Sequence, residues 1–266
     1  MADAAMLLGV VVVFFLLISF LLIKTPGWTL PGGINSRFVA VLMIELVGVG
    51  LPVAVFLKLK RLDPAAALGL RPAGVVSLAG AALMGLATVV VAPQFEAWQA
   101  RLVQPPERYL EALADFVSLE QGESLAWALV CLALVPALCE EALFRGVLLR
   151  ACLPRWKTST TIVVIGLVFG LFHFDLWRWP LLSAIGMLLT WCAVKAGSVW
   201  PAFVFHLVNN TASLLLANSD WPSREGWTTA AADVPPGLFA LGAVLLAAGA
   251  GLVGGGRRHG PAGDER

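Results

Sequence analysis

Residues 125–150 read LAWALVCLALVPALCEEALFRGVLLR, an apolar run of spanning length with two adjacent glutamates near its middle. The hydrocarbon core of a bilayer is about 30 Å thick, and about 20 apolar helical residues cross it. An acidic side chain at the centre of such a helix costs about 2.5–3.5 kcal/mol on insertion scales. Because Glu140 and Glu141 occur there together, we expect them to have a functional role inside a membrane-spanning helix.

The composition places the rest of the chain in lipid as well. Of 266 residues, 59% are hydrophobic and 13% are charged, and the mean hydropathy is +0.86. Soluble domains carry about 25% charged residues, so we expect an integral membrane protein in contact with membrane lipid. A net charge of +1 argues against a nucleic-acid partner. The cysteines lie in apolar segments without paired spacing, so we expect free buried thiols. They are Cys131, Cys139, Cys152 and Cys192.

Apolar runs of spanning length recur along the chain and predict an all-α, polytopic membrane protein with about eight transmembrane helices around an intramembrane polar cavity. The runs cover residues 4–23, 38–57, 74–92, 125–150, 159–174, 179–195, 199–217 and 236–253. The first run is interpreted as a retained helix, because no basic residue precedes it and no small-residue cleavage site follows it. In the fifth run, Gly166 and Gly170 form a GxxxG step, which indicates close helix packing.

Lysine and arginine in the loops predict the orientation of these helices. Eight spans place three basic segments on one side, and these contain Lys58, Lys60, Arg61, Arg71, Arg150, Arg155, Lys157, Arg257, Arg258 and Arg266. The opposite loops hold fewer basic residues, namely Lys24, Arg37, Arg101, Arg108, Arg178 and Arg224. We therefore expect both termini in the cytoplasm and a location in a bacterial inner (plasma) membrane.

The longest connection, 93–124, is polar and acidic but contains apolar residues at helical spacing. They are Tyr109, Leu110, Leu113, Phe116 and Val117. This periodicity predicts an amphipathic helix lying on the membrane. Plain surface packing is the preferred interpretation of that helix, and a lid facing a substrate is the alternative.

Few strongly polar groups lie within the predicted spans. Besides the glutamate pair, they are Glu45, His173, His206, Asn209 and Asn210. Helix geometry separates the two adjacent glutamates. Glu141 and Arg145 are four residues apart and can form an ion pair, whereas Glu140 points about 100° away from Glu141. Glu140 is therefore predicted to be the carboxylate without a local counter-charge.

The remaining polar groups supply what a water-activating hydrolase needs. His206 and Asn210 are four residues apart and face the same way, and Phe169 lies one turn before His173. A carboxylate in a low dielectric becomes a better base, and imidazoles and an amide can donate to a developing oxyanion. Each group alone has a structural explanation as an interhelical contact, and we interpret Glu45 as a packing residue outside the site. Together, however, the groups favour a function.

These residues form three motifs, Glu140-Glu141-x-x-x-Arg145, Phe169-x-x-x-His173 and His206-x-x-x-Asn210. In order and spacing the motifs resemble the signature of the CAAX-processing and bacteriocin-processing (CPBP) intramembrane proteases, which include the type II CAAX prenyl endopeptidases. The resemblance covers about 120–217, and Leu68-Gly69-Leu70-Arg71 looks like a segment common in bacterial members. It implies N-terminal helices and an amphipathic connection in 1–119, a catalytic core in 120–217, and a last helix with a cytoplasmic tail in 218–266.

The resemblance also implies peptide-bond hydrolysis without a covalent intermediate. Glu140 and His173 would activate the attacking water, and His206 and Asn210 would form the oxyanion site. No cofactor is expected; a zinc ion held by Glu140, His173 and His206 is the alternative. Counted from the cytoplasmic ends of their helices, His173 lies several ångströms deeper than the other two, so convergence requires a tilt or a late start of its helix.

Supporting roles fall to the neighbours of these residues in the motifs. By resemblance, Glu141 and Arg145 would orient the motif helix and contact the C-terminus of the substrate, with Phe169 in support. The substrate would be a membrane-associated or hydrophobic peptide or protein. A sorting-signal, bacteriocin or membrane-protein substrate is preferred over a prenylated one.

Three other functions compete with that of an intramembrane endopeptidase. The main alternative is a non-catalytic scaffold or an immunity or regulatory protein that keeps the polar cluster for stability. A thiol protease using Cys139 is disfavoured because this side chain points about 100° away from Glu140. A proton-coupled transporter is disfavoured because the sequence lacks paired broken helices in two matching halves.

Overall fold

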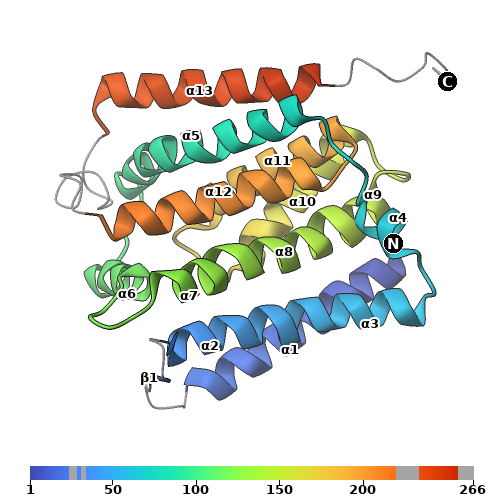
Figure 1. Ribbon diagram of the computed structural model, residues 1–266, viewed down its shortest axis with the longest axis horizontal. Coiled ribbons are helices and arrows are strands. Elements are labelled where there is room, and N and C mark those ends of the chain that lie inside the picture. The colour runs from blue at the N-terminus through green and yellow to red at the C-terminus, as the bar shows by residue number, and fades with distance from the viewer. Residues whose placement is uncertain (24–28, 31–33, 220–233, 257–266) are drawn as a thin grey trace.

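The structure, a computed structural model, describes residues 1–23, 29–30, 34–219 and 234–256. Within these residues the chain is helical almost throughout (Figure 1), which confirms the predicted all-α, polytopic class. The regular structure outside helices, within the same residues, is one short antiparallel pair, β1 (Thr29–Leu30) with β2 (Ile34–Asn35). Several predicted loop and tail cations lie outside the described residues; they are Lys24, Arg224, Arg257, Arg258 and Arg266.

Six helices are long and apolar enough to cross a membrane. Two of them are continuous helices that contain π-helical turns. The first consists of α2 (Ser36–Leu42), η1 (Met43–Gly50) and α3 (Leu51–Leu59). The second consists of α7 (Leu125–Leu129), η2 (Val130–Leu134), α8 (Val135–Glu141), η3 (Ala142–Leu148) and α9 (Leu149–Cys152). The other four are α1 (Ala2–Ile23), α5 (Val75–Ala100), α11 (Trp179–Ala196) and α13 (Pro236–Gly255).

Two further apolar helices correspond to the remaining predicted spans. The helix α10 (Thr158–Phe172) is too short to meet the length expected of a span. The helix α12 (Trp200–Ala217) has the length, but it contains His206, Asn209 and Asn210, which lower its hydropathy. All eight predicted segments are therefore helical, whereas the count of eight membrane crossings stays a prediction.

Local sequence sets several of the helix ends. Asp63 accepts a hydrogen bond from the first turn of α4 (Pro64–Leu68) and caps it. Pro180 and Pro201 lie in the first turns of α11 and α12, where the missing N–H removes no intrahelical bond. Gly197 adopts the left-handed conformation, with φ of 66°, that ends α11.

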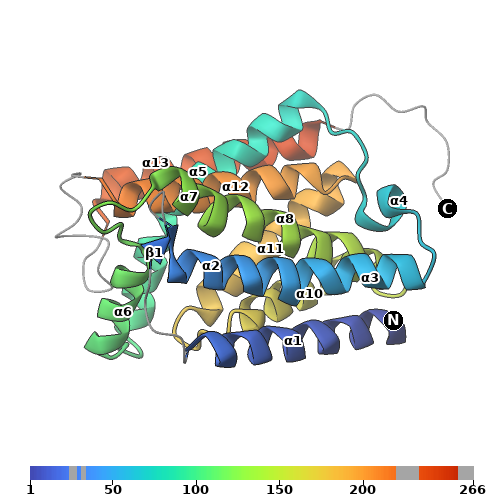
Figure 2. The same cartoon turned by 60° about the horizontal axis from the view of Figure 1, so that its bottom comes forward.

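The helices lie side by side in one bundle. In the view of Figure 1 the order from top to bottom is α13, α5, α12, α8, and then α3 with α1. α13 and α12 both pack against α5, and α10 packs against α11. The start of α1 and the end of α13 lie at one end of the bundle, and helix α6 (Glu107–Val117) lies at the opposite end (Figure 2).

Close helix packing depends on glycines at the contacts. A Cβ on Gly85 of α5 would lie 2.6 Å from the carbonyl oxygen of Phe205, so only glycine allows α12 to approach α5 this closely. The GxxxG prediction is confirmed by the same test. A Cβ on Gly166 would lie 2.3 Å from Met187, and one on Gly170 would lie 2.2 Å from Ser183 of α11.

Three π-helical segments were not predicted from the sequence. Such segments are rare and occur frequently at functional sites. The first, η1, contains Glu45, and the other two flank the short α8 that ends in Glu140 and Glu141. Because π turns change the angular spacing of side chains, the angles expected for a regular α-helix are only approximate in this part of the chain.

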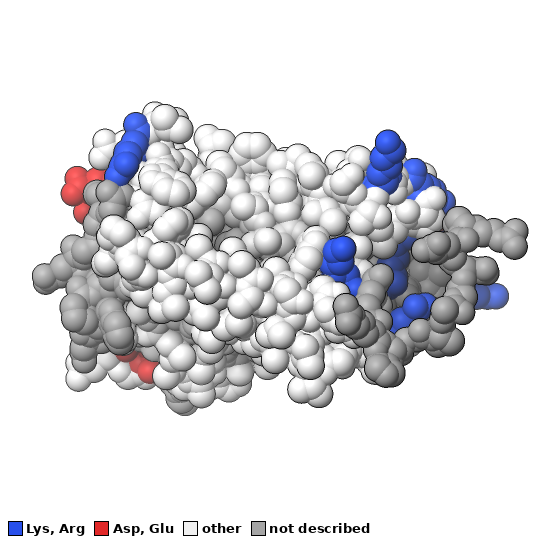
Figure 3. Space-filling view, turned by 90° about the horizontal axis from the view of Figure 1, so that it is seen from above, with Lys and Arg blue, Asp and Glu red and all other residues white. Residues whose placement is uncertain are grey.

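Charge divides the two ends of the bundle. Lysine and arginine gather toward the end that holds the start of α1, which we call the basic end (Figure 3). Its described basic residues are Lys58, Lys60, Arg61, Arg71, Arg150, Arg155, Lys157 and Lys195. The opposite end, which we call the α6 end, mixes arginines with acidic residues of α6 and its flanks.

Candidate active site

A polar cavity of about 860 Å³ lies inside the bundle, and all four predicted catalytic residues line it. They are Glu140, His173, His206 and Asn210. The cavity is deepest at Glu140 and His206, each of which is 5% exposed. It reaches the surface at the α6 end, where the lining residue Phe116 is 44% exposed.

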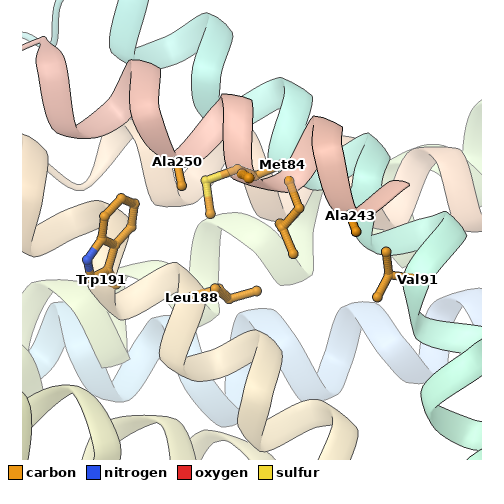
Figure 4. Close-up of a pocket in the computed structure, with 8 residues that line it drawn as sticks. Met84, Val91, Leu188, Trp191, Ala243 and Ala250 are labelled. Carbon is orange, nitrogen blue, oxygen red and sulfur yellow. The ribbon is translucent and has the colours of Figure 1, made fainter. Parts of the chain in front are cut away.

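A second hollow of about 340 Å³ lies between α5, α11 and α13 (Figure 4). Its lining is apolar and includes Met84, Val91, Leu188, Trp191, Ala243 and Ala250. Among the described residues, no titratable side chain lines this hollow. It therefore offers no acid or base, and the polar cavity is the candidate site.

Glu140 and His173 face each other across the polar cavity. Glu140 Oε2 lies 4.0 Å from His173 Nε2, and this oxygen has no hydrogen-bond partner among the described residues. The Nδ1 atom of His173 donates to the carbonyl oxygen of Phe169 at 2.9 Å, which fixes the ring. The depth difference expected from the sequence does not keep the two groups apart, although α10 begins at Thr158 and shows no late start.

Glu141 belongs to a separate, fully buried network. Its Oε1 accepts a hydrogen bond from Arg145 Nη1 at 2.7 Å, which confirms the predicted ion pair. Arg145 is 0% exposed, and its other donors bond the Gly186 carbonyl at 2.9 Å and the Thr190 hydroxyl at 3.3 Å. Its guanidinium also lies 4.4 Å from the centre of the Phe169 ring. Every part of the arginine therefore has a protein partner.

His206 contacts Glu141, a pairing that was not predicted from the sequence. His206 Nδ1 donates to Glu141 Oε1 at 2.9 Å. The close approach of α12 to α5 at Gly85 fixes how α12 packs in the bundle, and this tertiary contact is invisible in a one-dimensional pattern. Because Nδ1 is occupied, Nε2 is the ring nitrogen left for the cavity that His206 lines.

The expected contact of Glu141 and Arg145 with a substrate C-terminus does not fit their positions. Neither residue lines the cavity, and Glu141 is only 2% exposed. Arg145 is fully buried and each of its three guanidinium nitrogens already donates to a protein group, so a substrate carboxylate cannot reach it. The ion pair of Glu141 and Arg145 instead packs behind the cavity wall and stabilises it.

Phe169 is more central than a supporting residue was expected to be. Its ring contacts His173 at 4.8 Å and His206 at 5.9 Å between centroids, both edge to face. It also lies under the Arg145 guanidinium. Phe169 is thus the packing element that holds both histidines in place.

Asn210 belongs to a chain of polar contacts across three helices. Thr88 of α5 donates to the side-chain oxygen of Asn209 at 2.8 Å, and Asn209 donates to Asn210 at 3.3 Å. The Asn210 amide is 3.5 Å from the carbonyl oxygen of Leu132, at the outer limit of a hydrogen bond. Its amino group therefore keeps donor capacity for a ligand in the cavity.

Glu45 also lines the polar cavity, so the interpretation of this residue as lying outside the site is wrong. It is 5% exposed, and its Oε2 has no hydrogen-bond partner among the described residues. Its charge and that of Glu140 lie close enough to interact. The signal was present in the sequence, because an acidic residue within a span is by default a functional candidate.

Helix α6 forms the wall of the cavity at its mouth. The five apolar residues at helical spacing all line the cavity, which favours the alternative of a lid facing a substrate; that role stays a prediction. Tyr109 donates to Asp175 at 2.6 Å, and Asn218 donates to the Val117 carbonyl at 2.9 Å. Burial, followed by the bond to Asp175, raises the pKa of Tyr109 above its usual value, so this contact persists at neutral pH.

The alternative zinc site was tested against the geometry. Among the described residues, no group of three or more histidine, cysteine, aspartate or glutamate side chains is placed to hold a metal ion.

The cysteines are free and buried, as expected. Cys139 does not line the polar cavity. It is 8% exposed, and its sulfur packs against Gly50 at the end of η1. This position gives a thiol nucleophile no contact with the cavity.

The fold and the cavity define the class: a polytopic helical membrane protein with a carboxylate, two histidines and an amide in one intramembrane cavity. Residues 122–212 match the family described as Type II CAAX prenyl endopeptidase Rce1-like. This match contains the three motifs and supports the family that they predicted. No curated protein and no solved structure matches the chain.

Proposed function

We propose that the chain is an intramembrane endopeptidase that hydrolyses a peptide bond of a membrane-associated substrate in the polar cavity. The observation that carries this proposal is the placement of Glu140 Oε2 4.0 Å from His173 Nε2, in a cavity also lined by His206 and Asn210. The family match adds support, because the matched family is one of membrane proteases.

The first step is the activation of water between Glu140 and His173. A separation of 4.0 Å is too long for a direct hydrogen bond, but one water molecule can contact both atoms. As the water oxygen attacks the substrate carbonyl carbon, the Glu140 carboxylate takes its proton. His173 donates from Nδ1 to a backbone carbonyl, so its Nε2 is free to accept the second water proton as a hydrogen bond.

The second step is the collapse of the tetrahedral intermediate. The oxyanion lies where the Asn210 amino group can donate to it; His206 can donate from Nε2 only as the imidazolium, because its Nδ1 proton already bonds Glu141. Glu141 supports this arrangement by accepting from Nδ1 of His206 at 2.9 Å, which fixes the ring plane. The proton taken by Glu140 passes to the amine as the carbon–nitrogen bond breaks, which returns Glu140 to its carboxylate form.

The surroundings of these groups select the substrate class. Most of the cavity wall is apolar, and α6 contributes apolar side chains at its mouth. A peptide that partitions into lipid, or a segment anchored to a membrane, reaches such a cavity more readily than a soluble peptide. We infer a hydrophobic or membrane-anchored peptide, with or without a prenyl group.

The test is cleavage by purified protein reconstituted in lipid vesicles. The probes are internally quenched hydrophobic peptides, in one set with a prenylated cysteine near the C-terminus and in a matched set without it. We expect wild-type protein to cleave members of one set and Glu140→Ala to lose that activity. Cleavage that Glu140→Ala leaves unchanged would overturn the proposal. Folded protein that cleaves neither set would favour the scaffold or regulatory alternative.

A further inference from the structure

We propose that the substrate enters the cavity from the non-cytoplasmic side of the membrane, through the mouth at the α6 end. The part of this proposal that concerns the substrate rests on the proposed peptidase function, whereas the part that concerns access does not. Three features of the molecule carry it: where the cavity opens, where it is closed, and how the basic residues are distributed.

The cavity opens at the α6 end. Along α8 and η2, residues on the α6 side of Glu140, namely Pro136 and Leu132, line the cavity. Along α12, the lining continues from His206 through Ser213 to Ala217 at the end of the helix. Phe116 of α6, which lines the cavity at this end, is 44% exposed, whereas Glu140 is 5% exposed.

The cavity is closed toward the basic end. On the other side of Glu140, residues 143–149 are all buried, at 7% exposure or less, and none of them lines the cavity. Below them, Leu68 of α4 packs against Gly146. The connection after α4 is fixed to α12 and its preceding turn, because Val199 donates to the Gly69 carbonyl at 3.1 Å and Ser198 donates to the Arg71 carbonyl at 2.6 Å.

The distribution of lysine and arginine assigns the two ends to the two sides of the membrane. Among the described residues, the basic end carries eight lysines and arginines, whereas the α6 end carries four, namely Arg37, Arg101, Arg108 and Arg178. Connections rich in lysine and arginine stay in the cytoplasm. The closed end therefore faces the cytoplasm, and the mouth faces the opposite side.

The mouth itself fits a polypeptide of mixed polarity rather than an anionic tail. Its two arginines are already paired: Arg178 with Glu96 at 3.0 Å, and Arg37 with Glu123. Between these pairs lies the apolar face of α6. The substrate class that follows is an extracytoplasmic loop or terminus of a membrane-anchored or exported protein, in place of a lipidated terminus presented from the cytosol.

The experiment compares two matched serine-to-cysteine variants. Ser213→Cys places a thiol in the cavity near its mouth, and Ser159→Cys places one on the exposed first turn of α10 at the basic end. The native cysteines are buried and give a low background, measured on the parent protein. A membrane-impermeant maleimide is applied to intact spheroplasts and to inverted membrane vesicles. Both variants also carry Glu140→Gln, so the readout does not depend on activity.

The expected result is strong labelling of Ser213→Cys in spheroplasts and of Ser159→Cys only in inverted vesicles, with at least a tenfold preference in each case. Labelling of Ser213→Cys only in inverted vesicles, or in neither preparation, would overturn the proposal. Labelling requires no catalysis. The labelling result would therefore remain valid if the peptidase hypothesis failed, and the peptidase hypothesis would remain valid if labelling contradicted the proposed route of access.

Discussion

The two sides of α8 place neighbouring glutamates in opposite surroundings. On the cavity side, Glu140 has an oxygen without a hydrogen-bond partner among the described residues and faces His173 at 4.0 Å. On the packed side, Glu141 accepts from both Arg145 and His206 at under 3 Å. The difference shows that two residues of the same type, Glu140 and Glu141, can have different roles in one helix. A carboxylate whose partners are protein groups stabilises the fold, and one that faces a cavity can act on a ligand.

The largest effect is expected on the packed side, from Arg145→Leu. Removing one partner of a buried ion pair leaves an uncompensated charge and costs about 3–5 kcal/mol. We expect little folded protein, measured as monodisperse yield and thermal unfolding in detergent. The matched control is Arg155→Leu, because Arg155 is exposed and donates to a single backbone carbonyl. Equal yields of the two variants would contradict the structural role of the network.

Substitutions of the two histidines provide a second test of the difference between the cavity side and the packed side of α8. His173→Ala should lower the rate of peptide cleavage about 10²–10⁴-fold, the contribution of a general acid or base, with an unchanged unfolding temperature. His206→Ala should lower both the rate and the unfolding temperature, because it also removes a donor from Glu141. If the two variants lose stability to the same extent, the division between cavity side and packed side fails.

Glu45 tests how far the cavity side extends. Glu45→Gln keeps the shape of the side chain and removes its carboxyl group, whose Oε2 has no hydrogen-bond partner among the described residues. We expect kcat/KM to fall about tenfold, equivalent to about 1.4 kcal/mol, and stability to stay level. If the unfolding temperature drops while kcat/KM is unchanged, Glu45 is a packing residue, as the sequence was first interpreted.

The smallest effect is expected for Cys139→Ala. Its sulfur packs against Gly50 and does not line the cavity. The lost packing should cost about 1 kcal/mol, and cleavage should proceed at the wild-type rate. Loss of cleavage with an intact fold would revive a thiol mechanism.

Much of the fold could be predicted from the sequence because hydrophobic runs set the helices directly. The boundaries of α11 and α12, at Trp179–Ala196 and Trp200–Ala217, lie within a residue of those expected. In a bilayer the backbone of such a run must form its hydrogen bonds internally, so few structures other than a helix are available to it. Helix α5 is longer than expected, because it continues past Pro93 to Ala100 in a more polar sequence.

The site was predicted in its residues but not in its pairings. Which glutamate His206 contacts depends on how α12 packs against α5 at Gly85, a contact between segments distant in the sequence. The position of Glu45 depends on the π turns of η1, which no periodicity indicated. The apolar face of α6 has the same pattern whether it lies on lipid or lines a cavity.

The most direct measurement compares Glu140→Gln with Glu141→Gln, each assayed for peptide cleavage and for thermal unfolding. Both variants replace a buried carboxylate by an amide of the same shape, one residue apart. We expect Glu140→Gln to unfold like the wild type while cleavage falls by at least about 10²-fold, and Glu141→Gln to unfold at a clearly lower temperature. Cleavage retained in Glu140→Gln, or an equal loss of stability in both variants, would contradict the assignment of chemistry to Glu140 and support to Glu141.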